Sequence, residues 1–275
     1  MPVRAVAEGT VRPVGPLTWP ELAALGVDAV VTARSGGVSS GPYASLNLGL
    51  HVGDDPVAVV ENRRRAAALV GARLEDCVYC TQAHGRAVQR IGSADRGRGT
   101  VDATTAVADV DALVVGDPGV VAVVLMADCV PVLLVDPVAR LLAVVHAGWR
   151  GTVADVVGAT VDELRLAGAD VGRIRAWIGP AVDPGRYQVG DDVRDAADER
   201  FGADTPAVVV PDGTGRWRFD LWTANELLLR RAGVAGGNVS RVAALPTGTT
   251  GGDRFFSDRD ERPCGRFGLL ARLRP

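Results

Sequence analysis

The chain has 275 residues, of which 47% are hydrophobic and 23% are charged, and its formal net charge is −3 at pH 7. This composition is ordinary for a soluble globular enzyme with a substantial buried core. No run of basic residues indicates a nucleic-acid surface. Every basic residue counted is arginine, so the sequence excludes a catalytic lysine, Schiff-base chemistry and a Walker-type phosphate lysine.

The longest apolar run, Val120–Ala127, is far too short to span a bilayer, and Asp128 ends it. Residues 1–17 lack the apolar core and the cleavage pattern of a secretory signal. Four unevenly spaced cysteines do not indicate a disulfide framework. We therefore expect a reduced, cytoplasmic setting, with no membrane partner and no nucleic-acid partner.

The N-terminal third predicts a lead-in over residues 1–27 and the start of a single domain over 28–275, because no repeat or linker divides the chain. An Asp followed by Pro predicts the start of a helix over 55–70. A Gly/Ser loop over 34–43 would let the backbone approach a ligand closely, and a plain surface linker is the alternative. The strands predicted here are Ala29–Thr32 and Val78–Gln82.

The centre of the chain predicts a β-hairpin. Its β-branched runs are Val120–Met126, Val130–Val135 and Leu141–His146. The last two runs are joined by five residues, which fits a hairpin. Pairing Val135 with Leu141 carries Val130 opposite His146 and places Cys129 diagonally beside that histidine. Cross-strand neighbours lie roughly 5–8 Å apart, so we expect Cys129 and His146 to reach one metal ion or one proton.

After the hairpin, a Gly-Trp-Arg-Gly turn over 148–151 leads into a helix that Thr152 is expected to cap. A helix N-terminus beside Arg150 would form an anion site, and a solvated turn arginine is the alternative. Further along, we predict a helix over Phe219–Arg230 and a last strand over Leu269–Leu273. Together these elements predict one mixed α/β domain.

The candidate chemistry rests on His84, Cys129 and His146, because each lies at a predicted strand end and the chain has only three histidines. Imidazole and thiolate both suit Zn²⁺, and three protein ligands leave one position open for water. Such a water becomes a nucleophile near neutral pH. The same residues could instead supply a thiolate nucleophile with its base, or could each be an ordinary buried side chain.

Other polar residues carry weaker signals. Cys77 and Cys80 resemble half a zinc ribbon, but no second pair follows, and on a strand their thiols would point to opposite faces, so we expect no metal there. His51 is a weak pocket candidate beside the Gly/Ser loop. Asp128 and Asp111 could orient a ligand histidine, although for Asp111 a solvated strand carboxylate is the simpler interpretation.

A series of motifs in chain order then resembles one known family. They are Gly36-Gly37-Val38-Ser39, Leu46-Asn47-Leu48-Gly49, Glu61-Asn62-Arg63, Thr81-Gln82-Ala83-His84-Gly85, Ala127-Asp128-Cys129-Val130-Pro131, His146-Ala147-Gly148-Trp149-Arg150-Gly151, Ile178-Gly179-Pro180, Tyr187-Gln188-Val189 and Phe255-Phe256-Ser257. The chain resembles the YfiH family, the multicopper polyphenol oxidase or laccase-domain proteins. Its departures are Ala83 for a usual Val, Thr247 for a common Cys, and Asp258 for a common aromatic residue.

This resemblance implies an α/β (α+β) fold with mixed β-sheets flanked by helices, likened to cysteine hydrolases. It implies a zinc ion on the residues matching His84, Cys129 and His146. It also implies purine nucleoside phosphorylase activity, in which phosphate splits adenosine, inosine or methylthioadenosine into free base and ribose 1-phosphate, with some adenosine deamination. Older accounts of the family describe a copper-dependent polyphenol oxidase, and some members are described as peptidoglycan editing factors.

The first hypothesis is therefore a zinc enzyme of nucleoside cleavage, a monomer or small homo-oligomer whose partners are a purine nucleoside and phosphate. Arg150 is the candidate phosphate contact, and Asn47 and Gln82 are candidate contacts to ribose or base. A second hypothesis is a cysteine hydrolase or amidase acting on peptidoglycan precursors, with Cys129 as nucleophile and His146 as base. The others are a non-catalytic zinc-stabilised binding protein and a copper oxidase, since a Cys/His site also takes Cu²⁺ in vitro.

Overall fold

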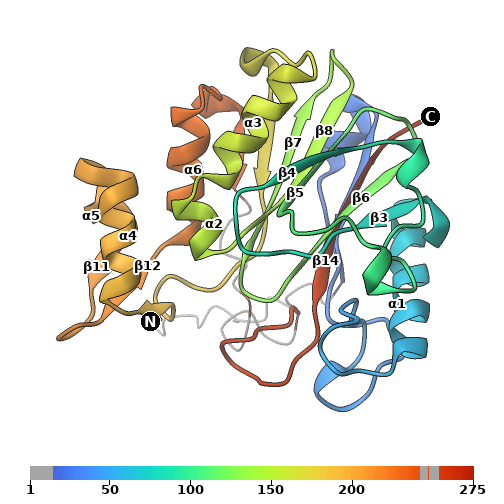
Figure 1. Ribbon diagram of the computed structural model, residues 1–275, viewed down its shortest axis with the longest axis horizontal. Helices are drawn as coiled ribbons and strands as arrows, with labels where there is room; N and C mark the ends of the chain where they lie inside the picture. The colour runs from blue at the N-terminus through green and yellow to red at the C-terminus, as the bar shows by residue number, and fades with distance from the viewer. Residues whose placement is uncertain (1–14, 242–246, 248–253) are drawn as a thin grey trace, which may run out of the picture.

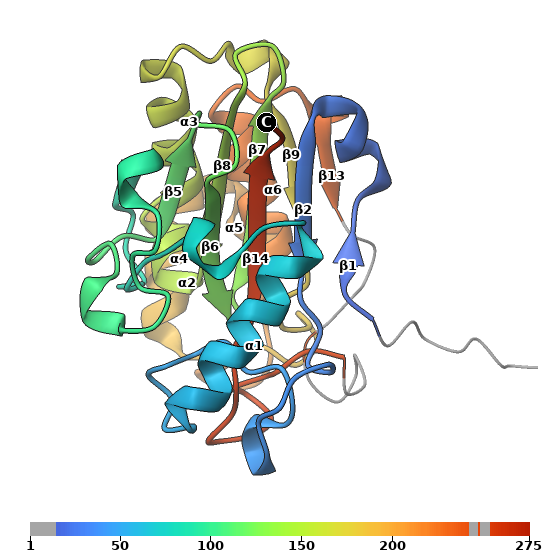
Figure 2. The ribbon, with the colours of Figure 1, turned by 90° about the vertical axis from the view of Figure 1, so that its right-hand side faces the viewer.

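Two β-sheets lie face to face at the centre of the molecule, and helices cover their outer sides (Figures 1 and 2). The computed structural model describes residues 15–241, 247 and 254–275. One sheet has the spatial order β1 (Leu17–Thr18), β2 (Val27–Val31), β14 (Phe267–Leu273), β6 (Val121–Met126) and β3 (Cys77–Tyr79). The other has the order β13 (Val239–Arg241), β9 (Arg175–Ile178), β7 (Val130–Asp136), β8 (Leu141–Ala147), β5 (Ala112–Val115) and β4 (Val88–Ile91).

Both sheets are mixed, as expected: β3 with β6, β4 with β5, and β9 with β13 run parallel, and the other pairs run antiparallel. Their facing sides bury a shared apolar core that includes Val124, Leu133, Val144 and Leu269. Strands buried on both faces read as continuous apolar runs. This explains why β6, β7 and β8 were the easiest elements to recognise in the sequence.

Helices close the two outer sides of the sheets. They are α1 (Pro56–Leu69), α2 (Trp149–Val153), α3 (Val156–Leu166), α4 (Asp191–Phe201), α5 (Thr205–Val208) and α6 (Leu221–Arg231). The first covers the five-stranded sheet, while α3 and α6 cover the six-stranded sheet (Figures 1 and 2). A three-stranded sheet of β10 (Gln188–Val189), β12 (Trp217–Phe219) and β11 (Val209–Pro211) lies beside α4 and α5.

The predicted register of the central hairpin was wrong by one residue. Val135 pairs with Leu142, and His146 lies opposite Pro131. The strands extend further than predicted because Asp136 pairs with Leu141 and its carboxylate accepts the backbone N–H groups at 138 and 139, which closes a tighter turn. Cys129 nevertheless comes directly before β7 and lies close to His146, as expected.

The expected helix cap at Thr152 was also wrong. Thr152 is buried inside α2, and a separate helix, α3, follows. Its cap is Asp155, whose side chain accepts the backbone N–H of Gly158 at 3.0 Å. An aspartate in this position satisfies the free N–H groups of a first helical turn. The two helices are separate because Asp155 adopts a left-handed backbone conformation, with φ of 68°.

The structure also tests the predicted start of the first helix and the predicted lead-in. Asp55 caps α1 and accepts from the N–H of Val57, as expected. Within the predicted lead-in over 1–27, β1 pairs with β2, and Trp19 and Leu22 are buried in the core. In the part of the chain that the structure describes, no helix has the length and apolar character needed to cross a membrane.

Candidate active site

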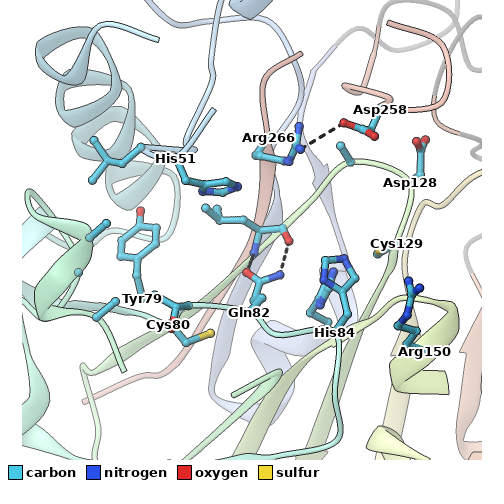
Figure 3. Close-up of a pocket in the computed structure, with 18 of the residues that line it drawn as sticks. His51, Tyr79, Cys80, Gln82, His84, Asp128, Cys129, Arg150, Asp258 and Arg266 are labelled. Carbon is cyan, nitrogen blue, oxygen red and sulfur yellow. Dashed lines mark hydrogen bonds and ion pairs between the residues drawn. The ribbon is translucent and has the colours of Figure 1, made fainter. Parts of the chain in front are cut away.

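The fold brings His84, Cys129 and His146 together from three separate segments (Figure 3). The first follows β3, the second lies between β6 and β7, and the third lies on β8. Their candidate ligand atoms all lie within 4.8 Å of one another. The two imidazole rings meet edge to face, with centroids 4.8 Å apart. Because His146 is buried and His84 is exposed, the cluster has a fixed inner wall and an open outer side.

Asp111 is a buried carboxylate that holds His146 and the backbone of His84 in place. The solvated carboxylate favoured from the sequence was wrong. The Asp111 side chain is fully buried and lies 2.8 Å from His146 Nδ1. The same carboxylate accepts the backbone N–H groups of His84 at 3.0 Å and Gly85 at 2.7 Å. A carboxylate partner at Nδ1 places the proton there and leaves Nε2 for a metal or a thiol. One acid therefore orients one histidine and positions the backbone of the other.

The Cys129 thiol has a pKa below the usual value for a cysteine. Burial by itself raises its pKa, but the imidazoles of His146 and His84 lower the pKa to about 6. Burial lowers the pKa of His146, whereas the Cys129 thiolate and the Asp111 carboxylate raise that pKa well above its usual value. The physical cause is the stabilisation of a thiolate and an imidazolium by each other. A thiolate is also the form that binds zinc.

The donor set and the space around it fit a zinc ion. Two imidazoles and one thiolate are a zinc ligand set with one position open. A Cβ atom at Gly148 would lie 2.9 Å from Cys129 Sγ and 3.0 Å from His84 Cδ2. The glycine of the His-Ala-Gly-Trp motif therefore keeps open the space between two of the ligands.

Asp128 joins the cluster to the C-terminal loop. Its backbone is left-handed, with φ of 85°, and its side chain is buried. The carboxylate accepts hydrogen bonds from the hydroxyls of Thr247 at 2.5 Å and Ser257 at 2.6 Å, and from the N–H of Arg259 at 2.7 Å. Thr247 thus contributes a hydroxyl donor to the Asp128 carboxylate. The loop that carries Asp258 and Arg259 is held over the cavity by these bonds.

The cluster opens into a cavity of about 550 Å³, a size typical of small-molecule sites. Arg150 lines the cavity near Cys129, and its guanidinium lies over the Trp149 ring at 4.2 Å. It lies in the first turn of the short helix α2 rather than before a longer helix. Among the described residues it has no carboxylate partner.

Of the two residues predicted to contact ribose or base, Gln82 lines the cavity and Asn47 does not. Gln82 lines the cavity, and its amide makes two hydrogen bonds to the backbone of Leu125, at 2.6 and 2.8 Å. Asn47 is fully buried and is not among the lining residues; it binds the N–H of Arg266 at 2.8 Å and the carboxylate of Asp54 at 2.9 Å. The position of Asn47 is that of a residue that holds loops together beside the cavity.

Several cavity residues were missed from the sequence. They are Arg63, Tyr79, Tyr187, Arg259, Arg262 and Arg266, while the weak candidate His51 does line the cavity. Arg63 had a detectable signal, because it shares the buried face of α1 with Val59 and Ala67 and an arginine there needs a polar partner. Cys80 also borders the cavity, but burial raises its pKa to about 12, which agrees with an unreactive thiol.

The fold and site define an α/β protein of mixed sheets with a His/Cys/His cluster at the end of a large cavity. The family model described as multi-copper polyphenol oxidoreductase laccase matches residues 28–274, and the chain belongs to this family. It is 41% identical to "Purine nucleoside phosphorylase YlmD" of Geobacillus stearothermophilus, over 88% of each chain. It is 38% identical to "Adenosine deaminase RL5" of an unknown prokaryotic organism, over 78% of this chain and 82% of that protein.

A solved structure supports the same assignment. The Bacillus licheniformis hypothetical protein YfiH superposes with a TM-score of 0.90 at 31% identity, covering 95% of this chain and 97% of that chain. The comparisons confirm the resemblance recognised from the motifs and the expected α/β fold with mixed sheets.

Proposed function

We propose that the protein is a purine nucleoside phosphorylase that cleaves adenosine, inosine or methylthioadenosine with phosphate into free base and ribose 1-phosphate. The observation that carries this proposal is the close similarity, over most of both chains, to a protein named purine nucleoside phosphorylase. The cavity adds support, because it combines a reactive cluster with cationic side chains in a space sized for a nucleoside. Such an enzyme would act in the cytoplasm, as a monomer or small homo-oligomer.

Phosphate would bind at the cluster end of the cavity, where Arg150 and Arg259 are the cations. Neither forms an ion pair within the described residues. Arg259 donates to the backbone carbonyl of Gln188 at 3.1 Å and lies over the ring of Tyr187 at 5.1 Å. A guanidinium without a carboxylate partner is free to bind an oxyanion through two N–H groups. These two arginines would hold phosphate close to Cys129.

A zinc ion would be held by His84, Cys129 and His146, and when bound it supplies a Lewis acid that polarises an oxygen atom. The protein's own contribution is to fix those ligands. Asp111 holds the Nδ1 proton of His146, and Gly148 keeps space for the ion. Cu²⁺ would also occupy such a set in vitro, so oxidation of phenols after copper loading would be weak evidence of function. Gln82 would border the bound ribose or base.

Two further activities have specific support. Adenosine deamination at the same cluster is suggested by the relative named adenosine deaminase. A cysteine hydrolase acting on peptidoglycan precursors is suggested by the order thiolate, imidazole and carboxylate in Cys129, His146 and Asp111. The activity of such a hydrolase would survive metal chelation and would be lost on thiol alkylation.

The test is to incubate the protein as purified, without added copper, with inosine and with adenosine, each with and without phosphate. Chromatography then separates the products. Release of hypoxanthine or adenine only when phosphate is present is the expected result. Equal release without phosphate would indicate a nucleoside hydrolase. No release by zinc-loaded protein from inosine, adenosine or methylthioadenosine, assayed in the same way, would contradict the proposal.

A further inference from the structure

The cavity has a second end that the proposed phosphate and metal sites do not use. We call it the distal end; it is lined by Leu50, His51, Arg63, Tyr79, Ala103 and Ala106. Figure 3 shows His51 and Tyr79 on one side of Gln82, and Cys129 and Arg150 on the other. A nucleoside has a base at one side of its glycosidic bond, and phosphate must approach from the other side. Two chemically different ends are therefore what the proposed reaction requires.

Arg63 is a buried cation without a carboxylate partner among the described residues. Its side chain projects from α1, and the residue is 3% exposed. Its Nε and Nη1 atoms donate to the backbone carbonyls of Leu48, Gly99 and Thr100. These bonds do not employ Nη2. A buried charge with only neutral partners is costly, and burial accordingly lowers the pKa of Arg63. An acceptor that gains negative charge would relieve this cost.

Tyr79 provides a buried polar atom that no group among the described residues satisfies. The residue is 2% exposed, and its ring centre lies 3.9 Å from the Arg63 guanidinium carbon. Its hydroxyl has no hydrogen-bond partner in residues 15–241, 247 and 254–275. Buried hydroxyl groups are almost always hydrogen-bonded, so an exception needs an explanation. In Figure 3 the hydroxyl lies at the end of the Tyr79 ring that is nearer to His51. A ligand atom that enters beside His51 would be the missing partner.

Two arginines, Arg266 and Arg63, lie near His51 and act on its charge. Burial lowers the pKa of this histidine, and the charges of Arg266 and Arg63 lower it further. Arg266 is paired with Asp258 at 3.3 Å, whereas Arg63 has no such partner in the described parts of the chain. A neutral imidazole can donate one hydrogen bond and accept another. The distal end therefore offers hydrogen-bond donors and excess positive charge.

The remaining walls of this end are apolar. Leu50, Ala103 and Ala106 contribute small or aliphatic side chains. Flat heteroaromatic ligands bind between such walls, with a few polar groups aligned along one ring edge. A free inorganic anion would gain nothing from these walls. The combination of apolar walls and cationic edge fits a purine ring better than it fits phosphate.

We propose that the distal end binds the purine base and stabilises the charge that the base acquires as it leaves, an inference that rests on the proposed phosphorylase function. In the reaction, a phosphate oxygen bonds to C1′ as the C1′–N9 bond breaks. The bonding electron pair stays on the purine, and the proton that HPO₄²⁻ carried ends on the base. Arg63 favours this step because a fixed cation in a dry site stabilises developing negative charge. Tyr79 and His51 align the ring edge.

The test uses Tyr79→Phe and His51→Ala, because Arg63 also holds three backbone carbonyls and its removal would disturb the fold. Tyr79→Phe removes only a hydroxyl that has no partner in the part of the chain that the structure describes. The matched control is Tyr43→Phe, whose hydroxyl binds the carbonyl of Val52 at 2.7 Å and is not among the lining residues. Calorimetry measures the dissociation constants of hypoxanthine and of inorganic phosphate, and steady-state kinetics measures kcat and KM for inosine.

We expect Tyr79→Phe and His51→Ala each to weaken hypoxanthine binding about tenfold, the effect of one lost hydrogen bond. Phosphate affinity should stay within about twofold of the wild type. The melting temperature of Tyr79→Phe should not fall. Unchanged hypoxanthine affinity in both variants of an active enzyme would overturn this inference alone, as would a loss of phosphate affinity instead. A wild type without phosphate-dependent base release would overturn the proposed function and this inference together.

Discussion

Cys129 and Cys80 border the same cavity, yet their surroundings give them opposite character. His146 and His84 lower the pKa of Cys129 to about 6 in spite of its burial. Burial raises the pKa of Cys80 to about 12, and the nearby charge of Asp111 raises it as well. Both thiols follow apolar strands, so neither position nor residue type distinguishes them. The difference teaches that the partners brought by other strands decide which cysteine is reactive.

The largest contrast is expected in alkylation of protein freed of metal by a chelator. At pH 7 Cys129 should react with iodoacetamide at least about a hundredfold faster than Cys80, because the thiolate is the nucleophile. Since the pKa of Cys129 is lowered, its thiolate is present above about pH 6 and the rate should fall as the pH falls through that value. Peptide mass spectrometry of quenched samples measures both rates. Equal rates at the two cysteines would contradict the claim that their surroundings make only Cys129 reactive.

The second largest effect is expected from removing the carboxylate that orients His146, one of the groups that distinguish Cys129 from Cys80. Asp111→Asn is expected to lower zinc affinity or phosphorolysis about 10–100-fold, the usual cost of losing an orienting partner. Asp109→Asn, an exposed acid two positions away, is the matched control. Competition with a chromophoric chelator measures the affinity. Activity and zinc affinity in Asp111→Asn equal to those of the control would show that His146 is oriented by other groups.

A smaller effect is expected from filling the space beside Cys129. Gly148→Ala places a Cβ atom 2.9 Å from its Sγ, so zinc affinity should fall about tenfold as the ligand set is displaced. Gly237→Ala is the control, because nothing lies within 4 Å of a Cβ there. Both variants should keep the melting temperature of the metal-free wild type within about 5 °C. A Gly148→Ala protein with wild-type zinc affinity would mean that the cluster does not need this space.

Apolar runs made the central strands predictable, because strands buried on both faces carry uninterrupted hydrophobic patterns. The helix α1 was predictable from a different signal, the Asp-Pro pair at its start. Other features depend on contacts between distant residues. The hairpin register depended on the Asp136 turn, and α4 is rich in Asp and Arg with few apolar residues. The small sheet pairs Gln188 with Arg218, too far apart in sequence for a local pattern to reveal.

Some features of the site could likewise be predicted from the sequence, and others could not. The three-residue cluster was predictable because rare residue types ended strong strands. The sequence offered Asp111 as a carboxylate that orients a histidine but favoured a solvated one, since an acid at the start of a strand gives the same pattern whether it faces a histidine or water. The distal end combines α1, β3 and the loops around His51 and Ala103, so no single segment shows it.

The most direct test of the account follows ribose 1-phosphate formation from inosine and phosphate by ³¹P NMR. Wild type, Cys129→Ala and Cys80→Ala are compared at equal concentration. We expect wild type and Cys80→Ala to produce the ribose 1-phosphate resonance at similar rates, and Cys129→Ala to produce none above background. Full activity in Cys129→Ala, or equal loss in both variants, would contradict the claim that the His84, Cys129 and His146 cluster is the reacting end of the cavity.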